Sequence, residues 1–195
     1  MRLGLILLAV VPLCGQGLDA SERQRALGAQ LDRELRRRVS VVDVPEAIDY
    51  LDRLAERLVA QFPGDRLRLT FMVMSDDTTG GSHEPIALPG GYFFVPAKLF
   101  LEARDGTVFA GMIAHAIAHL AVNHGPVQWM YPELAGDAYP IGLAQRQQSI
   151  EREAHALAAQ VMARTTQLPE FPAAKEAVRR KVDSGFANRT VPIFH

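Results

Sequence analysis

The sequence predicts an α+β fold that is mostly helical and contains a small sheet. Three observations predict it: long segments with apolar residues at helical spacing, short β-prone runs between them, and an ordinary globular composition. Of the 195 residues, 48% are hydrophobic and 22% are charged, which is enough apolar material for one sizeable core. We therefore expect a single domain over residues 18–195.

The N-terminus has the features of an export signal. Arg2 is followed by an apolar run, Leu3–Leu13, which is too short to span a bilayer comfortably. Gly15 and Gly17 are small residues suitably spaced for cleavage after Gly17. We therefore expect residues 1–17 to be a signal peptide and the protein to be periplasmic or secreted. The alternative is an uncleaved anchor that associates the protein with a membrane.

Charge and cysteine content narrow the possible partners. The net charge of −1 gives no case for nucleic acid or for an anionic membrane surface as a partner. Cys14 is the only cysteine, so no disulfide can form within the chain. Lipidation of Cys14 is possible in principle, but Leu13 is a poor fit to the small residue that bacterial lipoprotein signals prefer.

Two helices and two strands are expected in the first half of the domain. The helices are Ser21–Arg38 and Pro45–Phe62, and the second has apolar residues at helical spacing. Arg66–Met74 alternates and then becomes apolar, which is typical of a strand entering a sheet. Pro89-Gly90-Gly91 breaks the chain before a β-prone run, Tyr92–Val95. Near the C-terminus, Ala173–Val182 is expected to form a short basic helix.

The central helix carries two histidines one turn apart. Thr107–His124 is apolar on most faces, which is typical of a buried helix, and Gly125-Pro126 ends it. His115 and His119 stand at positions i and i+4, so their imidazoles share a helix face and can meet one tetrahedral ion. Alternatively, they are two core histidines bonded to backbone carbonyls, because buried polar ring edges need partners.

A second helix, Ser149–Arg164, supplies a third candidate ligand and another histidine. Ser149 is the expected N-cap. Glu151 follows His119 by 32 residues, which leaves room for a loop and a return helix. Two histidines and one carboxylate form a usual catalytic zinc site, but Glu151 could equally be a solvated first-turn residue favoured by the helix dipole. His155, one turn later on the same face, is an extra ligand, a donor to Glu151 or an exposed helix residue.

Three segments, in order, resemble the HtpX-like and CAAX-prenyl-protease family of zinc metallopeptidases. They are Ala87–Val95, similar to the family's A-x-P-G-G strand; Ala114–His124, similar to its A-H-E-[IL]-A-H helix; and Glu151–His155, similar to its E-x-E-A-D. The resemblance implies a zincin-like domain that binds one zinc ion through His115, His119 and Glu151.

The resemblance also implies a substrate-binding strand. The segment Gly90, Gly91, Tyr92 and Phe93 is similar to the family's edge strand, which lines the active-site cleft. An extended or unfolded peptide or protein pairs with such a strand by β-augmentation. The alternative is an ordinary core strand preceded by a glycine turn.

Two positions depart from the family pattern. Ala116 stands where the motif H-E-x-x-H has the glutamate that acts as general base, and His155 replaces the family's aspartate, which resembles a partner of a metal ligand. Because general acid–base catalysis contributes about 10²–10⁴-fold, the expected peptidase activity is very weak or absent. Glu84, Glu133 and His155 are of the right type to substitute for the base, but the sequence does not place them.

Three functional interpretations follow from these departures. The chain is a weakly active metalloendopeptidase, a non-catalytic relative that binds peptides or acts as a chaperone, or an engineered Glu→Ala knock-out of an active peptidase. Since silencing an enzyme needs one change, the two departures at positions 116 and 155 favour a natural origin.

Overall fold

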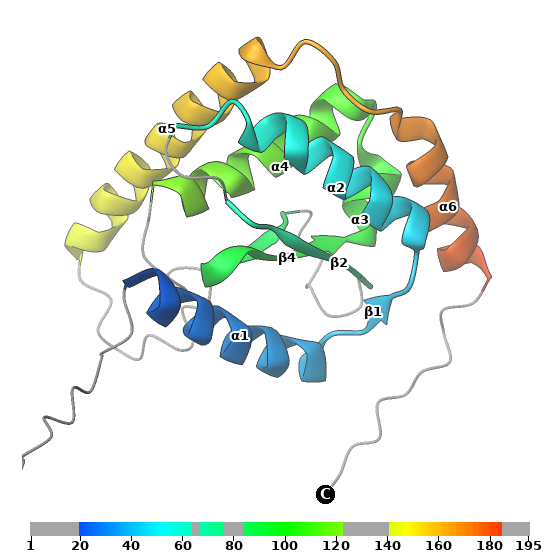
Figure 1. Ribbon diagram of the computed structural model, residues 1–195, viewed down its shortest axis with the longest axis horizontal. Coiled ribbons are helices and arrows are strands. Elements are labelled where there is room, and N and C mark those ends of the chain that lie inside the picture. Colours follow the sequence, from blue (N-terminus) through cyan, green and yellow to red (C-terminus); the bar gives the residue numbers. More distant parts are fainter. Residues whose placement is uncertain (1–19, 64–66, 76–83, 123–140, 185–195) are drawn as a thin grey trace, which may run out of the picture.

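The computed structural model describes residues 20–63, 67–75, 84–122 and 141–184, and Figure 1 shows their arrangement. Within these ranges the helices are α1 (Ala20–Arg38), α2 (Pro45–Val59), α3 (Ala97–Glu102), α4 (Gly106–Ala121), α5 (Ile141–Arg164) and α6 (Phe171–Asp183). The strands are β1 (Val41–Val42), β2 (Thr70–Met74), β3 (Ile86–Leu88) and β4 (Tyr92–Pro96), and a 3-10 turn, η2 (Pro89–Gly91), joins β3 to β4. The mostly helical α+β fold is confirmed. The expected signal peptide, residues 1–17, lies outside the described residues.

The described strands form one mixed sheet in the order β1-β2-β4-β3. β2 and β4 run parallel at its centre, and β1 and β3 pair antiparallel at its edges. The expectation that Gly90, Gly91, Tyr92 and Phe93 belong to an edge strand is therefore wrong. Tyr92–Pro96 pairs on both sides, and the edge strand of this segment is Ile86–Leu88. Its three residues between Pro85 and Pro89 are too few to show a strand pattern in the sequence.

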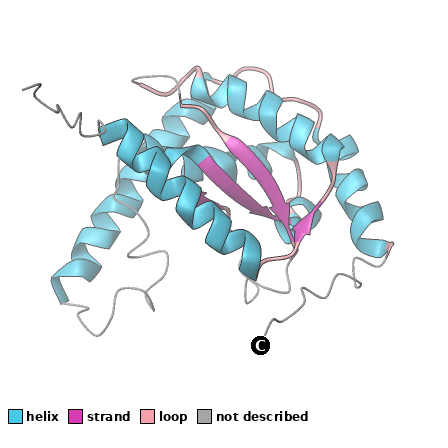
Figure 2. Cartoon of the chain, turned by 60° about the horizontal axis from the view of Figure 1, so that its bottom comes forward, coloured by secondary structure: helices cyan, strands magenta, loops and turns pink. Residues whose placement is uncertain are grey.

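Side chains of the central strands alternate between the two faces of the sheet, as the two-residue period of a strand requires. One face enters the larger core together with residues of α2 to α6; its strand residues are Phe71, Val73, Phe93 and Val95. The other face packs against Leu35 of α1 and against Val39, which follows that helix; its strand residues include Met72, Met74 and Phe94. The sheet thus lies between α1 on one side and α2 with α4 on the other, and Figure 2 shows α1 crossing the strands.

Helix α4, which carries the paired histidines, is fixed at its N-terminal end. The Asp105 carboxylate caps it by accepting hydrogen bonds from two backbone N–H groups of the first turn, at 3.0 and 2.9 Å. One turn later, the Phe109 ring packs on Phe100 and Phe171, with centroid separations of 4.4 and 4.9 Å. The cap and the aromatic contacts together fix the position at which α4 enters the core. They therefore also fix the position of its second half, which carries His115 and His119.

Several helix boundaries differ from the expectation. α5 begins at Ile141, so Ser149 lies inside the helix and is not its N-cap; the residues before it, rich in Ala, Gln and Leu, are good helix formers. α2 ends at Val59 rather than at Phe62. Helix α4 ends at Ala121 within the described residues, and the expected helix end at Gly125-Pro126 lies outside them.

Glycine 28 allows α1 to cross the turn between β3 and β4. A Cβ atom built at Gly28 would lie 1.7 Å from the backbone oxygen of Pro89. The turn itself contains Gly90 with φ 76° and Gly91 with φ 91°, a backbone region that favours glycine. The close approach of helix and turn therefore depends on three glycines.

Replacing Gly28 with alanine is expected to destabilise the protein. Helix propensity favours alanine by about 1 kcal/mol, but the new methyl group would meet backbone that cannot rotate away, and overpacking of this kind costs about 1–3 kcal/mol or more. Urea unfolding would measure the difference. Gly111→Ala is the matched control, because a Cβ there meets nothing within 4 Å. An equal increase in the free energy of unfolding of both variants would contradict the close approach of α1 to the turn between β3 and β4.

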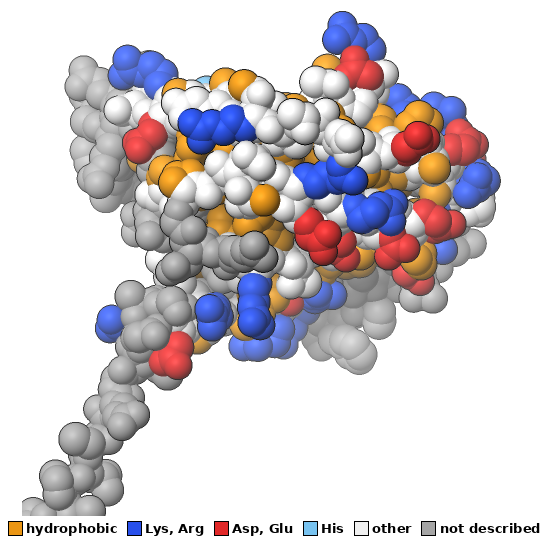
Figure 3. Space-filling view, turned by 45° about the horizontal axis from the view of Figure 1, so that its top comes forward, with side chains coloured by type: hydrophobic (Ala, Val, Ile, Leu, Met, Phe, Trp, Pro, Cys, Tyr) orange, Lys and Arg blue, Asp and Glu red, His pale blue; other side chains and the backbone are white. Residues whose placement is uncertain are grey.

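The surface carries charges of both signs. On the face turned forward in Figure 3, basic and acidic side chains are interspersed, in keeping with the net charge of −1. Neighbouring opposite charges limit the reach of the electric field over this face. In the described part of the chain, no helix combines the length and apolarity needed to cross a bilayer.

Candidate metal centre

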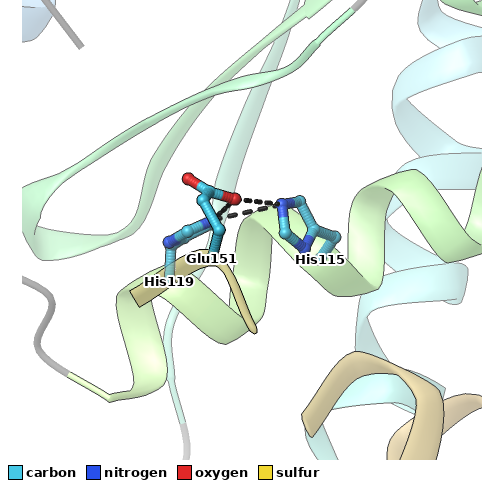
Figure 4. A group of neighbouring side chains, drawn as sticks. All are labelled: His115, His119 and Glu151. Carbon is cyan, nitrogen blue, oxygen red and sulfur yellow. Dashed lines mark hydrogen bonds and ion pairs between the residues drawn. The ribbon is translucent and has the colours of Figure 1, made fainter. Parts of the chain in front are cut away.

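Two helices distant in sequence bring three metal-binding side chains together. α5 packs along α4, and the small residues Ala154 and Ala158 are buried in the core that they share with α4. Figure 4 shows His115 and His119 rising from α4 and Glu151 reaching toward both from α5. The structure thus brings together the three residues that the sequence indicated.

The donor atoms of these residues form a nearly equilateral triangle. His115 Nε2 lies 3.1 Å from His119 Nε2, and Glu151 Oε2 lies 3.3 Å from the former and 3.4 Å from the latter. In a tetrahedral zinc site with bonds of about 2.0–2.2 Å, ligand atoms stand about 3.3–3.6 Å apart. Two edges of the triangle fall in this range and the edge between the histidines is about 0.2 Å shorter, so the triangle is close to the size that one zinc ion requires.

The chemistry of the donors also fits a cation. Lone pairs that converge at these distances repel one another unless a proton or a metal ion lies among them. The side chains of His115, His119 and Glu151 are 21%, 12% and 35% exposed, so the group is partly shielded from water yet open on one side. Among the described residues, these three form the cluster that could hold a metal ion, a group consistent with a zincin-like fold.

The protonation state of His115 suits metal binding. Burial lowers the pKa of His115 and the neighbouring His155 lowers it further, whereas the carboxylates of Glu151 and Glu84 oppose the shift. The net direction is down, so the imidazole is neutral near pH 7 and keeps a lone pair for a metal ion.

Position 116 offers no proton acceptor. Ala116 is 5% exposed and its side chain is part of the larger core. Of the possible substitutes, Glu84 is exposed but close enough to act on the charge of His115, and Glu133 lies outside the described residues. The sequence named Glu84 by its type alone; its position near His115 follows from the fold of the chain.

His155 lies beside the triangle rather than in it. Its Nδ1 donates a hydrogen bond of 2.8 Å to the backbone carbonyl of Glu151, and its ring lies against that of His115 with centroids 4.2 Å apart and planes tilted by 45°. The side chain is exposed. In this arrangement His155 bonds the backbone of Glu151, not its carboxylate.

The expected substrate-binding residues lie deeper than an edge strand would. Phe93 is fully buried and Gly91 is buried, while Gly90 and Tyr92 are half-buried. The strand that lies beside α4 is β3, and it is the last strand of the described sheet. If a peptide pairs with this sheet near the triangle, the available edge is Ile86–Leu88.

Comparison with curated proteins shows a partial similarity. No protein-family model matches the chain. Over 92 residues, 47% of the chain, it is 33% identical to the "Putative beta-barrel assembly-enhancing protease" of Vibrio cholerae serotype O1 (strain ATCC 39315 / El Tor Inaba N16961). The matched stretch is 18% of the length of that relative. The chain is thus distantly and partially homologous to a protein named as a protease, and its His-His-Glu triangle suggests a metallopeptidase.

Proposed function

We propose that the protein is a zinc-binding metallopeptidase of the HtpX-like and CAAX-prenyl-protease type whose peptide hydrolysis is very slow. The observation that carries this proposal is the triangle of His115, His119 and Glu151, with edges of 3.1, 3.3 and 3.4 Å. Those distances, between side chains of two helices, are close to the ligand separations of a zinc site. The distant homology to a named protease supports the same class of chemistry.

The described residues account for binding but not for proton transfer. His115 and His119 would hold the ion through Nε2, and Glu151 would hold it through its carboxylate. A zinc ion in such a site supplies acidification of water and polarisation of a substrate carbonyl. Hydrolysis also needs a group that takes a proton from water and returns it to the leaving amine. The methyl group of Ala116 cannot do either, so we infer a rate about 10²–10⁴-fold below that of an enzyme with the base.

Metal uptake tests this proposal. Protein stripped with a chelator and dialysed against zinc is expected to contain one zinc ion per chain, and His119→Ala is expected to lose it, because two donors remain of three. Elemental analysis of both proteins, with folding checked by circular dichroism, gives the answer. Absence of zinc from the parent protein, or full retention by folded His119→Ala, would refute the proposed centre.

A second candidate function is peptide binding without hydrolysis. It is favoured by β3, because among the described residues no strand pairs with the outer edge of Ile86–Leu88, and that edge lies beside the helix of the two histidines. An extended or unfolded polypeptide could add there by β-augmentation. Such a protein would bind denatured substrates with micromolar or weaker affinity and leave them intact. A slow peptidase would instead release fragments, and a chelator would stop that release.

A further inference from the structure

Among the described residues, one nitrogen of His115 has no hydrogen-bond partner, although a metal-binding histidine normally has one there. His115 Nε2 faces the other two donors, so the neutral tautomer that presents its lone pair there carries its proton on Nδ1. That Nδ1 atom is buried and has no hydrogen-bond partner among the described residues. Histidines that bind metals almost always donate this second N–H to a carboxylate, a carbonyl or water, which fixes the ring and raises its basicity.

The side chain beside His115 makes a ring contact with it and forms no hydrogen bond with its Nδ1. His155 lies with its ring centroid 4.2 Å from that of His115, tilted by 45°. Its own Nδ1 is already engaged with the Glu151 carbonyl, at 2.8 Å, so the ring is held in place from its own helix. Its contact with His115 is a ring contact, which restricts the tilt of that imidazole and includes no hydrogen bond to Nδ1.

We propose that His155 is a positioning residue that keeps the metal centre weak and readily exchanged. It orients His115 through ring contact and, among the described residues, leaves the Nδ1 proton without an acceptor. This inference rests on the proposed metal centre. Since the loss of such a partner typically lowers metal affinity about 10–100-fold, a carboxylate at position 155 is expected to raise zinc affinity by about the same factor.

Zinc dissociation constants of five proteins test the proposal. Competition with a chromophoric chelator would compare the parent protein with His155→Asp, His155→Asn, His155→Ala and Ala156→Asp. His155→Asp is expected to bind zinc about 10–100-fold more tightly. His155→Asn, with a neutral acceptor oxygen, should gain less, and His155→Ala should gain nothing. Ala156→Asp is the control for added charge, because residue 156 is exposed and adjacent in sequence; its affinity should match that of the parent.

A spectroscopic measurement separates hydrogen bonding from a general change of structure. In zinc-loaded His155→Asp, the His115 Nδ1 proton is expected to appear at low field and to exchange slowly in nuclear magnetic resonance spectra of the imidazole groups. The parent protein should lack that protected proton. If His155→Asp does not fold, the same comparison with His155→Asn tests the proposal.

The outcomes distinguish this inference from the proposed function. Zinc bound equally or less tightly by folded His155→Asp than by the parent would overturn the role of His155 and leave the metal centre standing. Equal gains in His155→Asp and Ala156→Asp would also overturn it, since charge alone would then be responsible. Failure of every protein to bind zinc would overturn both, and so would binding by His155→Asp alone, since the parent would then lack the proposed centre.

Discussion

Replacing Ala116 with glutamate is expected to raise peptide turnover about 10²–10⁴-fold, the usual contribution of general acid–base catalysis. Residue 116 directly follows His115 and precedes His119 by one short turn, so it lies on the flank of the helix face that carries both imidazoles. A carboxylate there could reach the open side of the donor triangle, where the methyl group of Ala116 cannot exchange a proton. Cleavage of an unfolded protein substrate, followed by fragment release with and without a chelator, measures the change.

Ala116→Gln is the matched control for that experiment. Glutamine has nearly the same volume and can hydrogen-bond but cannot act as a base near neutral pH. Because position 116 is 5% exposed, both variants strain the core alike, and thermal unfolding with zinc analysis would confirm that both fold and bind. Equal turnover in the two variants, or no gain over the parent despite bound zinc, would show that the absent carboxylate does not limit the rate.

Replacing Glu151 with alanine is expected to lower zinc affinity by more than the roughly 10–100-fold that loss of an outer partner costs. Glu151 Oε2 stands 3.3 and 3.4 Å from the two imidazole nitrogens and supplies the one negative charge of the triangle. The parent should therefore gain about 2.7 kcal/mol in unfolding free energy when zinc is at 100 times its dissociation constant, and the variant should gain far less. Denaturant unfolding with and without zinc measures both gains.

Glu153→Ala separates the role of Glu151 from that of negative charge on α5. Glu153 is exposed, two residues further along the same helix, and outside the triangle. Its removal should leave the zinc-dependent gain almost unchanged. Similar losses in the two variants would mean that the carboxylate of Glu151 acts only through long-range attraction.

Much of the fold could be predicted from local pattern. The apolar positions of α2 and the wholly apolar stretch of α4 specify buried helices, and the β-prone run from Tyr92 specifies a strand. It was harder to predict which strands pair with each other, because pairing joins residues that are distant in sequence. Ile86–Leu88 is too short to be recognised alone, and the resemblance placed the edge strand at Gly90, Gly91, Tyr92 and Phe93. The cap Asp105 was missed as well, although an aspartate three residues before Val108 is a signal that could have located it.

The candidate site was predictable where one helix contains it. The spacing of His115 and His119 fixes their common face. Glu151 was a candidate by residue type and by its place on a following helix, and the family resemblance favoured it as a ligand. The packing of α5 on α4 brings it within 3.4 Å of both histidines. The ring contact of His155 with His115 could not be predicted from the sequence, since it depends on the rotation of one helix against another. Similarly, the approach of Glu84 to His115 depends on the packing of β3 beside α4.

Anomalous X-ray diffraction at the zinc absorption edge, from crystals of the parent protein grown with zinc, tests the central claim most directly. The account predicts one strong peak about 2.0–2.2 Å from His115 Nε2, His119 Nε2 and a carboxylate oxygen of Glu151, with His155 outside that distance. Well-ordered density for the three side chains without a peak among them, or a peak bound elsewhere, would contradict it.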